Sequence, residues 1–189
     1  MKADFDYKEF YLSDYKERPT CNPKGIMFHC TGGSSGTAAV NWFHSPENKE
    51  KTCSNLVIDR NGGITLLLPS TKTAYHAGVG EWGEYKDNIN SSFLGFELAN
   101  ASNAIKGDYD HYGYPIGKKE IINNQEFQTY PDKQIRTAAY FAAYYMNMHN
   151  IPINMLIGHS DYAPSRKKYD PGPHFPWEKL KEYIEYFKS

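Results

Sequence analysis

Two histidines and one aspartate, far apart in the sequence, could together bind a metal ion. His29 ends the apolar segment GIMFHC, residues 25–30, and His159 ends NMLIGH, residues 154–159. Asp170 follows His159 closely. Two imidazoles and one carboxylate, with a fourth position left open, form the ligand set of a catalytic zinc site. No local spacing motif supports this set, and composition alone favours an ordinary surface or core role for any one of the seven histidines.

The stretch GHSDYAPSRKKYDPGPHFPW, residues 158–177, carries both His159 and Asp170. Its prolines exclude a long helix, because each lacks a backbone N–H and has a fixed φ angle. We therefore predict a loop whose shape is set by its own sequence. Loops on a rigid scaffold are where catalytic groups concentrate.

Composition narrows the class of protein. The 189 residues suffice for one domain with a hydrophobic core, and a net charge of −1 gives no electrostatic case for binding nucleic acid. The three cysteines, Cys21, Cys30 and Cys53, are too few for a disulfide framework. We see no apolar core of a signal peptide and no run of about 18 apolar residues that could span a membrane.

The hydrophobic pattern predicts a single α/β domain. Residues 132–150 place apolar side chains on one face at helical spacing, and Asn61-Gly62-Gly63 marks a β-hairpin between two β-rich runs. The predicted strands are 25–30, the two arms of 54–69, 73–78 (a strand or an extended edge), 93–100 and 154–159; the predicted helices are 37–43, 132–150 and 176–188.

The stretch between Asn100 and Pro131 shows no clear helix and is rich in Gly, Asn, Asp and Tyr. A connection of this length is usually functional or disordered. Its tyrosines Tyr109, Tyr112 and Tyr114 could line a groove. A solvated excursion from the domain explains the same composition equally well.

The blocks FHCTGG, VIDRNGGITLLLP, TAYHAG, LGFELAN and GHSDYAPSRKKYDPGPHFPW resemble the zinc-dependent N-acetylmuramoyl-L-alanine amidases. This type-2 amidase family also contains the peptidoglycan recognition proteins. The blocks follow the family's order from about residue 25 to 180. The resemblance implies a central mixed β-sheet flanked by helices, with zinc in a groove at one edge of the sheet. We expect residues 25–189 to form one catalytic domain and residues 1–24 to form an extension that packs on it.

The resemblance assigns zinc binding to His29, His159 and Asp170. The loop would bring Asp170 back beside His159, and the rigid Pro171-Gly172-Pro173 turn would fix the direction of its carboxylate. The implied substrate is the amide between N-acetylmuramic acid and L-alanine of peptidoglycan. Zinc would lower the pKa of a bound water to ~7 and polarise the carbonyl.

Two further positions carry the chemistry that the resemblance implies. Glu97, in GFELAN, matches the general base of family members that use glutamate, although it could instead face solvent on an edge strand. A lysine before Asp170 would stabilise the oxyanion. The loop is one residue longer than is common in the family, so Lys168 and Lys167 both satisfy a family spacing rule. Because side chains two apart in an extended segment point the same way, we predict Lys168.

Other residues are expected to contact substrate or support the site. His76 matches a groove-lining histidine, with a structural hydrogen bond as the alternative. Asn55 stands where many relatives carry histidine, and Tyr112 is the third predicted substrate contact. Cys30 is expected to be a buried thiol rather than a fourth ligand, and Asp161 and His174 to be structural.

Three functions compete. The leading one is a zinc hydrolase that cuts peptidoglycan or muropeptides. The second is a recognition module that binds muropeptides without cutting, against which the complete ligand set argues. A zinc peptidase of another fold is disfavoured because the chain contains no H-E-x-x-H. A monomer made in the cytoplasm is expected, with a phage endolysin preferred over an injected effector or a muropeptide-recycling enzyme.

Overall fold

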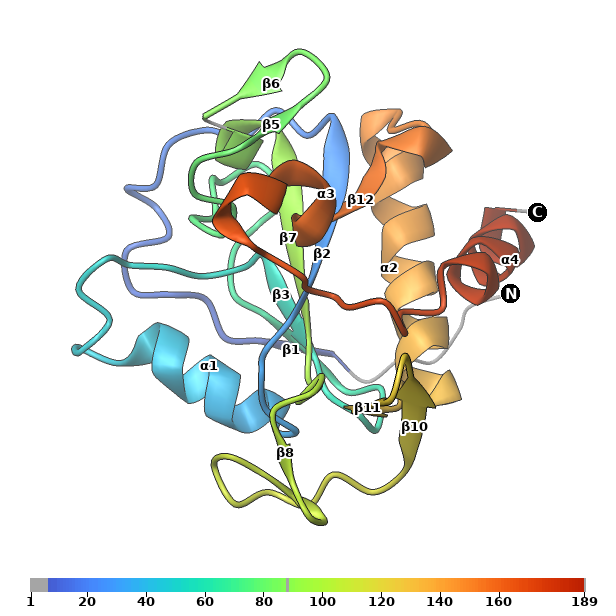
Figure 1. The fold of residues 1–189 in the computed structure, drawn as a ribbon. Helices are drawn as coiled ribbons and strands as arrows, with labels where there is room; N and C mark the ends of the chain where they lie inside the picture. The colour runs from blue at the N-terminus through green and yellow to red at the C-terminus, as the bar shows by residue number, and fades with distance from the viewer. Residues whose placement is uncertain (1–6, 88, 189) are drawn as a thin grey trace.

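A mixed six-stranded β-sheet forms the centre of the protein (Figure 1). The computed structural model describes residues 7–87 and 89–188. The strand order is β1-β4-β3-β7-β2-β12, and within this sheet β3 and β4 are antiparallel while the other pairs are parallel. The strands are β1 (Tyr7–Glu9), β2 (Gly25–Cys30), β3 (Leu56–Ile58), β4 (Ile64–Leu66), β7 (Phe93–Leu98) and β12 (Leu156–Gly158).

The two faces of the sheet serve different purposes. In the β2–β7 pair, Phe28 lies opposite Phe96 and His29 lies opposite Glu97. Because successive side chains in a strand point to opposite faces, the two phenylalanines share one face and His29 and Glu97 share the other. Both phenylalanines belong to the main hydrophobic core. The opposite face carries His29 and Glu97 beside buried side chains of two smaller hydrophobic clusters.

Helices α2 (Asp132–His149) and α4 (Trp177–Lys188) lie side by side and pack into the hydrophobic core on the apolar face of the sheet, while the shorter helices α1 (Gly36–His44) and α3 (His159–Tyr162) lie apart from this pair (Figure 1). The longest begins after Pro131 and ends at Asn150, which adopts the left-handed conformation (φ 55°) common at helix ends. The first helix begins at Ser35, whose hydroxyl accepts a hydrogen bond from the N–H of Ala38.

Most predicted elements are confirmed. The strand at 25–30 has the predicted bounds, the hairpin around Asn61-Gly62-Gly63 forms between β3 and β4, and α2 ends one residue earlier than predicted. Residues 73–78 contain no strand, so the strand predicted there as one alternative is wrong. The loop after β12 is not wholly irregular, because it contains the single turn α3 and the short 3-10 helix η3 (Pro164–Arg166).

The stretch between Asn100 and Pro131 forms hairpins that the sequence did not predict. The carboxylate of Asp110 is buried and accepts hydrogen bonds from the N–H groups of Ser34, Tyr112 and Tyr114. These bonds hold the first hairpin against the segment that follows β2. The hairpins of this stretch are, in chain order, β8 (Ile105–Lys106) with β9 (Tyr109–Asp110) and β10 (Lys119–Ile122) with β11 (Gln125–Gln128). Another small hairpin, β5 (Glu81–Trp82) with β6 (Tyr85–Lys86), precedes β7.

The N-terminal extension joins the sheet. Its strand β1 pairs in parallel with β4 at one edge, and Leu12 and Cys21 are buried in hydrophobic clusters. The first six residues of the predicted extension lie outside the described residues. Among the helices that the structure describes, none is both long and apolar enough to cross a lipid bilayer.

Candidate metal centre

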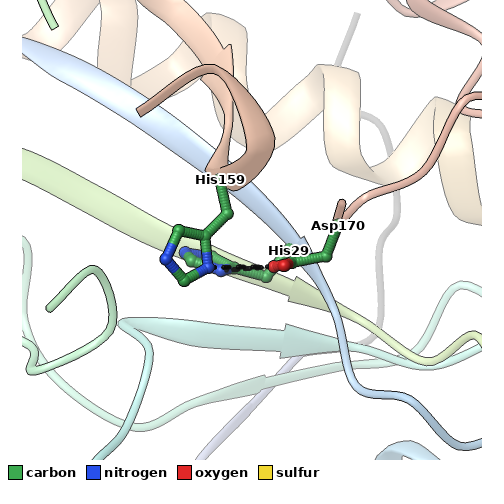
Figure 2. A group of neighbouring side chains, drawn as sticks. All are labelled: His29, His159 and Asp170. Carbon is green, nitrogen blue, oxygen red and sulfur yellow. Dashed lines mark hydrogen bonds and ion pairs between the residues drawn. The ribbon is translucent and has the colours of Figure 1, made fainter. Parts of the chain in front are cut away.

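The structure brings the three predicted ligand residues together (Figure 2). His29 lies near the end of β2, His159 directly follows β12, and Asp170 lies in the loop after η3. Oδ2 of Asp170 lies 3.0 Å from Nδ1 of His29 and 3.1 Å from Nδ1 of His159. One potential ligand atom from each residue lies within 4.8 Å of the other two.

This geometry fits a small cation bound by nitrogen and oxygen. Tetrahedral bonds of about 2.0–2.1 Å place neighbouring ligand atoms about 3.3 Å apart, close to both measured separations. Nε2 of His159 lies 2.9 Å from the carbonyl oxygen of Ala77. Because a carbonyl oxygen only accepts, Nε2 must carry the proton, and Nδ1 of a neutral His159 presents a lone pair to Asp170. Nδ1 of His159 and Oδ2 of Asp170 then face each other with lone pairs only, and a bound cation would remove this repulsion.

The charge states of the ligands also suit a metal. Burial lowers the pKa of His29 and favours its neutral, metal-binding form. Burial alone would raise the pKa of Asp170, but the adjacent imidazoles of His159 and His29 hold it well below the ordinary aspartate value. Asp170 is therefore ionised. A neutral imidazole and a carboxylate are the protonation states in which these side chains bind metals.

Hydrogen bonds on both sides of Asp170 hold its loop. The backbone carbonyl of Asp170 accepts from the N–H of Ser160 at 2.9 Å, and the carbonyl of Pro171 accepts from the hydroxyl of Tyr130 at 2.7 Å. The carboxylate of Asp161, in the same loop, accepts from the N–H of Gly158 at 2.7 Å. Asp161 therefore orders the loop from within, the structural role expected of it.

Glu97 and Lys168 both line the cavity of about 1040 Å³ that contains the three candidate ligands. Glu97 lies on β7 beside His29, inside the sheet rather than on an edge strand. Burial raises the pKa of Glu97 to about 8; the nearby Asp170 adds to this shift and Lys168 opposes it. A carboxyl group with a near-neutral pKa can both accept and release a proton at physiological pH.

The two candidate lysines lie in different surroundings. Lys168 is half-buried and lines the cavity, and its charge acts on both His29 and Glu97. Lys167 is exposed, ends η3 and has a left-handed backbone conformation (φ 55°). Of the two lysines, Lys168 is the one that lines the cavity.

Tyr112 and Asn55, two of the predicted substrate contacts, differ in placement. Tyr112 lines the cavity and is largely exposed, so it is available to a ligand. Asn55 is buried, and its side-chain amide bonds the backbone at Gly95, Pro69 and Lys72. We therefore propose that Asn55 is structural rather than a substrate contact.

Two of the remaining side chains face protein groups. Both ring nitrogens of His76 lie within hydrogen-bonding distance of protein atoms, on His29 and on the carbonyl of Phe93. Burial raises the pKa of the Cys30 thiol to about 12, although the residue is only partly buried by exposed area and lines the cavity. Cys30 does not belong to the candidate metal cluster found among the described residues.

Sequence reasoning missed the groups that hold the ligands from outside. The carbonyl of Ala77 bonds the ring of His159, and the hydroxyl of Tyr130 bonds the carbonyl of Pro171, next to Asp170. The side chain of Asn90 bonds the backbone N–H groups of residues 76 and 77. A backbone carbonyl leaves no signal in residue type. The only available hint was that Ala77 lies in the TAYHAG block.

Comparison with known proteins identifies similar chains. The sequence profile of the family described as N-acetylmuramoyl-L-alanine amidase matches residues 19–173. N-acetylmuramoyl-L-alanine amidase AmiD of Escherichia coli K12 is 28% identical over 117 residues, covering 62% of this chain and 36% of AmiD. The 1,6-anhydro-N-acetylmuramyl-L-alanine amidase AmpD of the same organism is 28% identical over 134 residues, covering 71% of this chain and 59% of AmpD.

Solved structures show the same fold. A selenomethionine derivative of AmpD superposes with a TM-score of 0.69 at 21% identity, covering 95% of this chain and 94% of that one. AmiD from E. coli, in complex with anhydro-N-acetylmuramic acid-L-Ala-D-gamma-Glu-L-Lys, superposes with a TM-score of 0.65 at 22% identity, covering 87% and 58%. The chain spans between 36% and 59% of the length of these two curated relatives.

Proposed function

Because the chain belongs to the N-acetylmuramoyl-L-alanine amidase family, we propose that it hydrolyses the amide between N-acetylmuramic acid and L-alanine of peptidoglycan. The observation that carries the proposal is the convergence of His29, His159 and Asp170 in a cavity that also contains Glu97 and Lys168. A recognition module that only binds has no need of a carboxyl group with a near-neutral pKa beside a complete ligand set.

We propose zinc as the metal, held by Nδ1 of His29, Nδ1 of His159 and Oδ2 of Asp170. When bound, zinc would polarise the scissile carbonyl and lower the pKa of a coordinated water to ~7. The two Nδ1 atoms and Oδ2 of Asp170 already converge, so zinc binding would need little change in these side chains. The two outer imidazole nitrogens are bonded to protein groups, which leaves both inner nitrogens for the metal.

The remaining steps belong to Glu97 and Lys168. The carboxylate of Glu97 would accept the proton of the attacking water and pass it to the leaving nitrogen of L-alanine. The ammonium of Lys168 would stabilise the negative charge that develops on the carbonyl oxygen. Tyr112, exposed at the rim of the cavity, would contact the substrate outside the reacting amide.

The function is tested by following the cleaved bond directly. We expect purified protein to release stem peptides with a free L-alanine amino group from muropeptides, detected by mass spectrometry. Chelation should abolish the release and added zinc should restore it. Binding of muropeptide without cleavage by the zinc-loaded protein would contradict the proposal and favour a recognition module. Relative rates on intact sacculi and on soluble muropeptides would separate a wall-lytic enzyme from a recycling one.

Replacing the two lysines one at a time tests the oxyanion role. We expect Lys168→Ala to cost ~2–4 kcal/mol of transition-state stabilisation, the range for the loss of one oxyanion donor. Lys167→Ala makes the same change one residue away and should cost far less, because Lys167 is exposed outside the cavity lining. Turnover is compared at equal zinc occupancy. A larger loss in Lys167→Ala would mean that the loop presents the other lysine.

A further inference from the structure

His76 connects a ligand histidine to the backbone of the sheet. Its Nε2 lies 3.0 Å from the carbonyl oxygen of Phe93, and its Nδ1 lies 2.9 Å from Nε2 of His29. Both ring nitrogens are therefore engaged with protein atoms. This leaves His76 poorly placed to bond a substrate, although the ring borders the cavity.

The protons along this chain of bonds can be assigned by elimination. The carbonyl of Phe93 only accepts, so Nε2 of His76 must carry a proton. In a neutral imidazole with its proton on Nε2, the other ring nitrogen has no proton, so Nδ1 of His76 is an acceptor. Nε2 of His29 must then donate. A neutral His29 with its proton on Nε2 presents the lone pair of Nδ1 to Asp170 and the metal position.

We propose that His76 is a positioning residue that fixes the tautomer of His29 and so prepares its Nδ1 as a metal ligand. The inference rests on the metal site of the proposed function. Partners outside a metal's ligands commonly act in this way, by fixing the tautomer and ring orientation of a ligating histidine.

The segment of residues 76–77 bonds both ligand histidines. The side chain of His76 holds His29, and the carbonyl of the next residue, Ala77, accepts from Nε2 of His159 at 2.9 Å. Oδ1 of Asn90 accepts from the backbone N–H groups of both His76 and Ala77, at 3.0 and 2.9 Å. Asn90 thus fixes the position of the segment from which both outer bonds are made.

The sheet leaves space for the His76 ring at a single glycine. A Cβ atom placed on Gly95 would lie 2.8 Å from Cγ and 2.9 Å from Cδ2 of His76. Such contacts are too close, so a side chain at this position would displace the ring. Gly95 stands on β7 between Phe93, which accepts from His76, and Glu97. The absence of a side chain there lets the imidazole lie against the strand.

The tautomers can be measured directly. In histidine-labelled protein at pH 8, long-range ¹H–¹⁵N correlation spectra should show His76 protonated on Nε2 with and without zinc. His29 should carry its proton on Nε2 in the zinc-free protein. A proton on Nδ1 of either ring would overturn the inference. Failure of the wild-type protein to bind zinc, with these tautomers present, would instead overturn the metal site of the proposed function.

Substitution gives a second, independent readout. His76→Phe keeps a planar ring but removes both hydrogen-bonding nitrogens, and we expect zinc affinity to fall about 10–100-fold in a chelator competition. His149→Phe is the matched control, because it removes an imidazole bonded to Ser70 far along α2. Its zinc affinity should equal that of the wild type. Unchanged zinc affinity in a folded His76→Phe protein would overturn the inference.

Discussion

Glu97→Gln is expected to lower turnover ~10²–10⁴-fold while leaving bound zinc in place, which is the usual contribution of a positioned general base. The amide of glutamine has nearly the shape of the carboxyl group but cannot take the proton of the attacking water. Zinc should be retained because the ligands are other side chains, His29, His159 and Asp170. Turnover and zinc content are measured on the same preparation, with exposed Glu81→Gln as the control. Near-normal turnover in Glu97→Gln would place the base elsewhere.

The same substitution should change how stability depends on pH. Burial raises the pKa of Glu97 from 4.5 to about 8 in the folded protein, so the folded state holds this proton more tightly than the unfolded chain. The stability that this gives is fully present below pH 4.5 and is lost as the pH rises through 8. In zinc-free protein, the thermal unfolding midpoint of Glu97→Gln should therefore rise relative to that of the wild type as the pH is raised from 5 to 9. A difference in midpoint between the two proteins that stays the same across this pH range would contradict the raised pKa of Glu97.

The strands and helices that bury a continuous apolar face were predictable from the sequence. GIMFHC and the helix from 132 show clear hydrophobic patterns, and Asn61-Gly62-Gly63 is a strong turn signal. Strand β1 gave no such signal, because its three residues are exposed and it forms only by pairing with β4. The hairpins after Asn100 were missed because they are held by the buried carboxylate of Asp110, through bonds to distant backbone groups.

In the candidate site, the identity of the residues could be predicted from the sequence, but the orientation of their side chains could not. His29, His159, Asp170 and Glu97 could be proposed from their positions in blocks resembling a family, and the fold then places them around one cavity. The orientation of the two histidines could not be proposed, since it depends on the side chain of His76 and on the carbonyls of Phe93 and Ala77. For the same reason the sequence leaves a substrate contact and a structural hydrogen bond both open for His76, and the structure places both ring nitrogens against protein atoms. Residue type suggests that a histidine matters but not which of its neighbours use its nitrogens.

Asp170→Asn is expected to abolish both zinc binding and hydrolysis. Oδ2 of Asp170 is the atom on which Nδ1 of both candidate histidine ligands converges, and it supplies the negative charge of the set. A neutral amide of the same shape removes that charge and leaves a site of two imidazoles. We expect metal analysis to find no stoichiometric zinc and turnover to fall to that of chelated wild-type protein.

Thermal unfolding provides the matching readout without an activity assay. A ligand that binds only the folded state stabilises it by about 2.7 kcal/mol at 100 times its Kd, so zinc should raise the unfolding midpoint of the wild type. The midpoint of Asp170→Asn should not respond to zinc. Asp132→Asn is the control, because this aspartate pairs with Lys179 at the start of α2 and its loss should leave the zinc response intact. A full zinc response in Asp170→Asn would remove Asp170 from the ligand set, because the charge it contributes would then be dispensable.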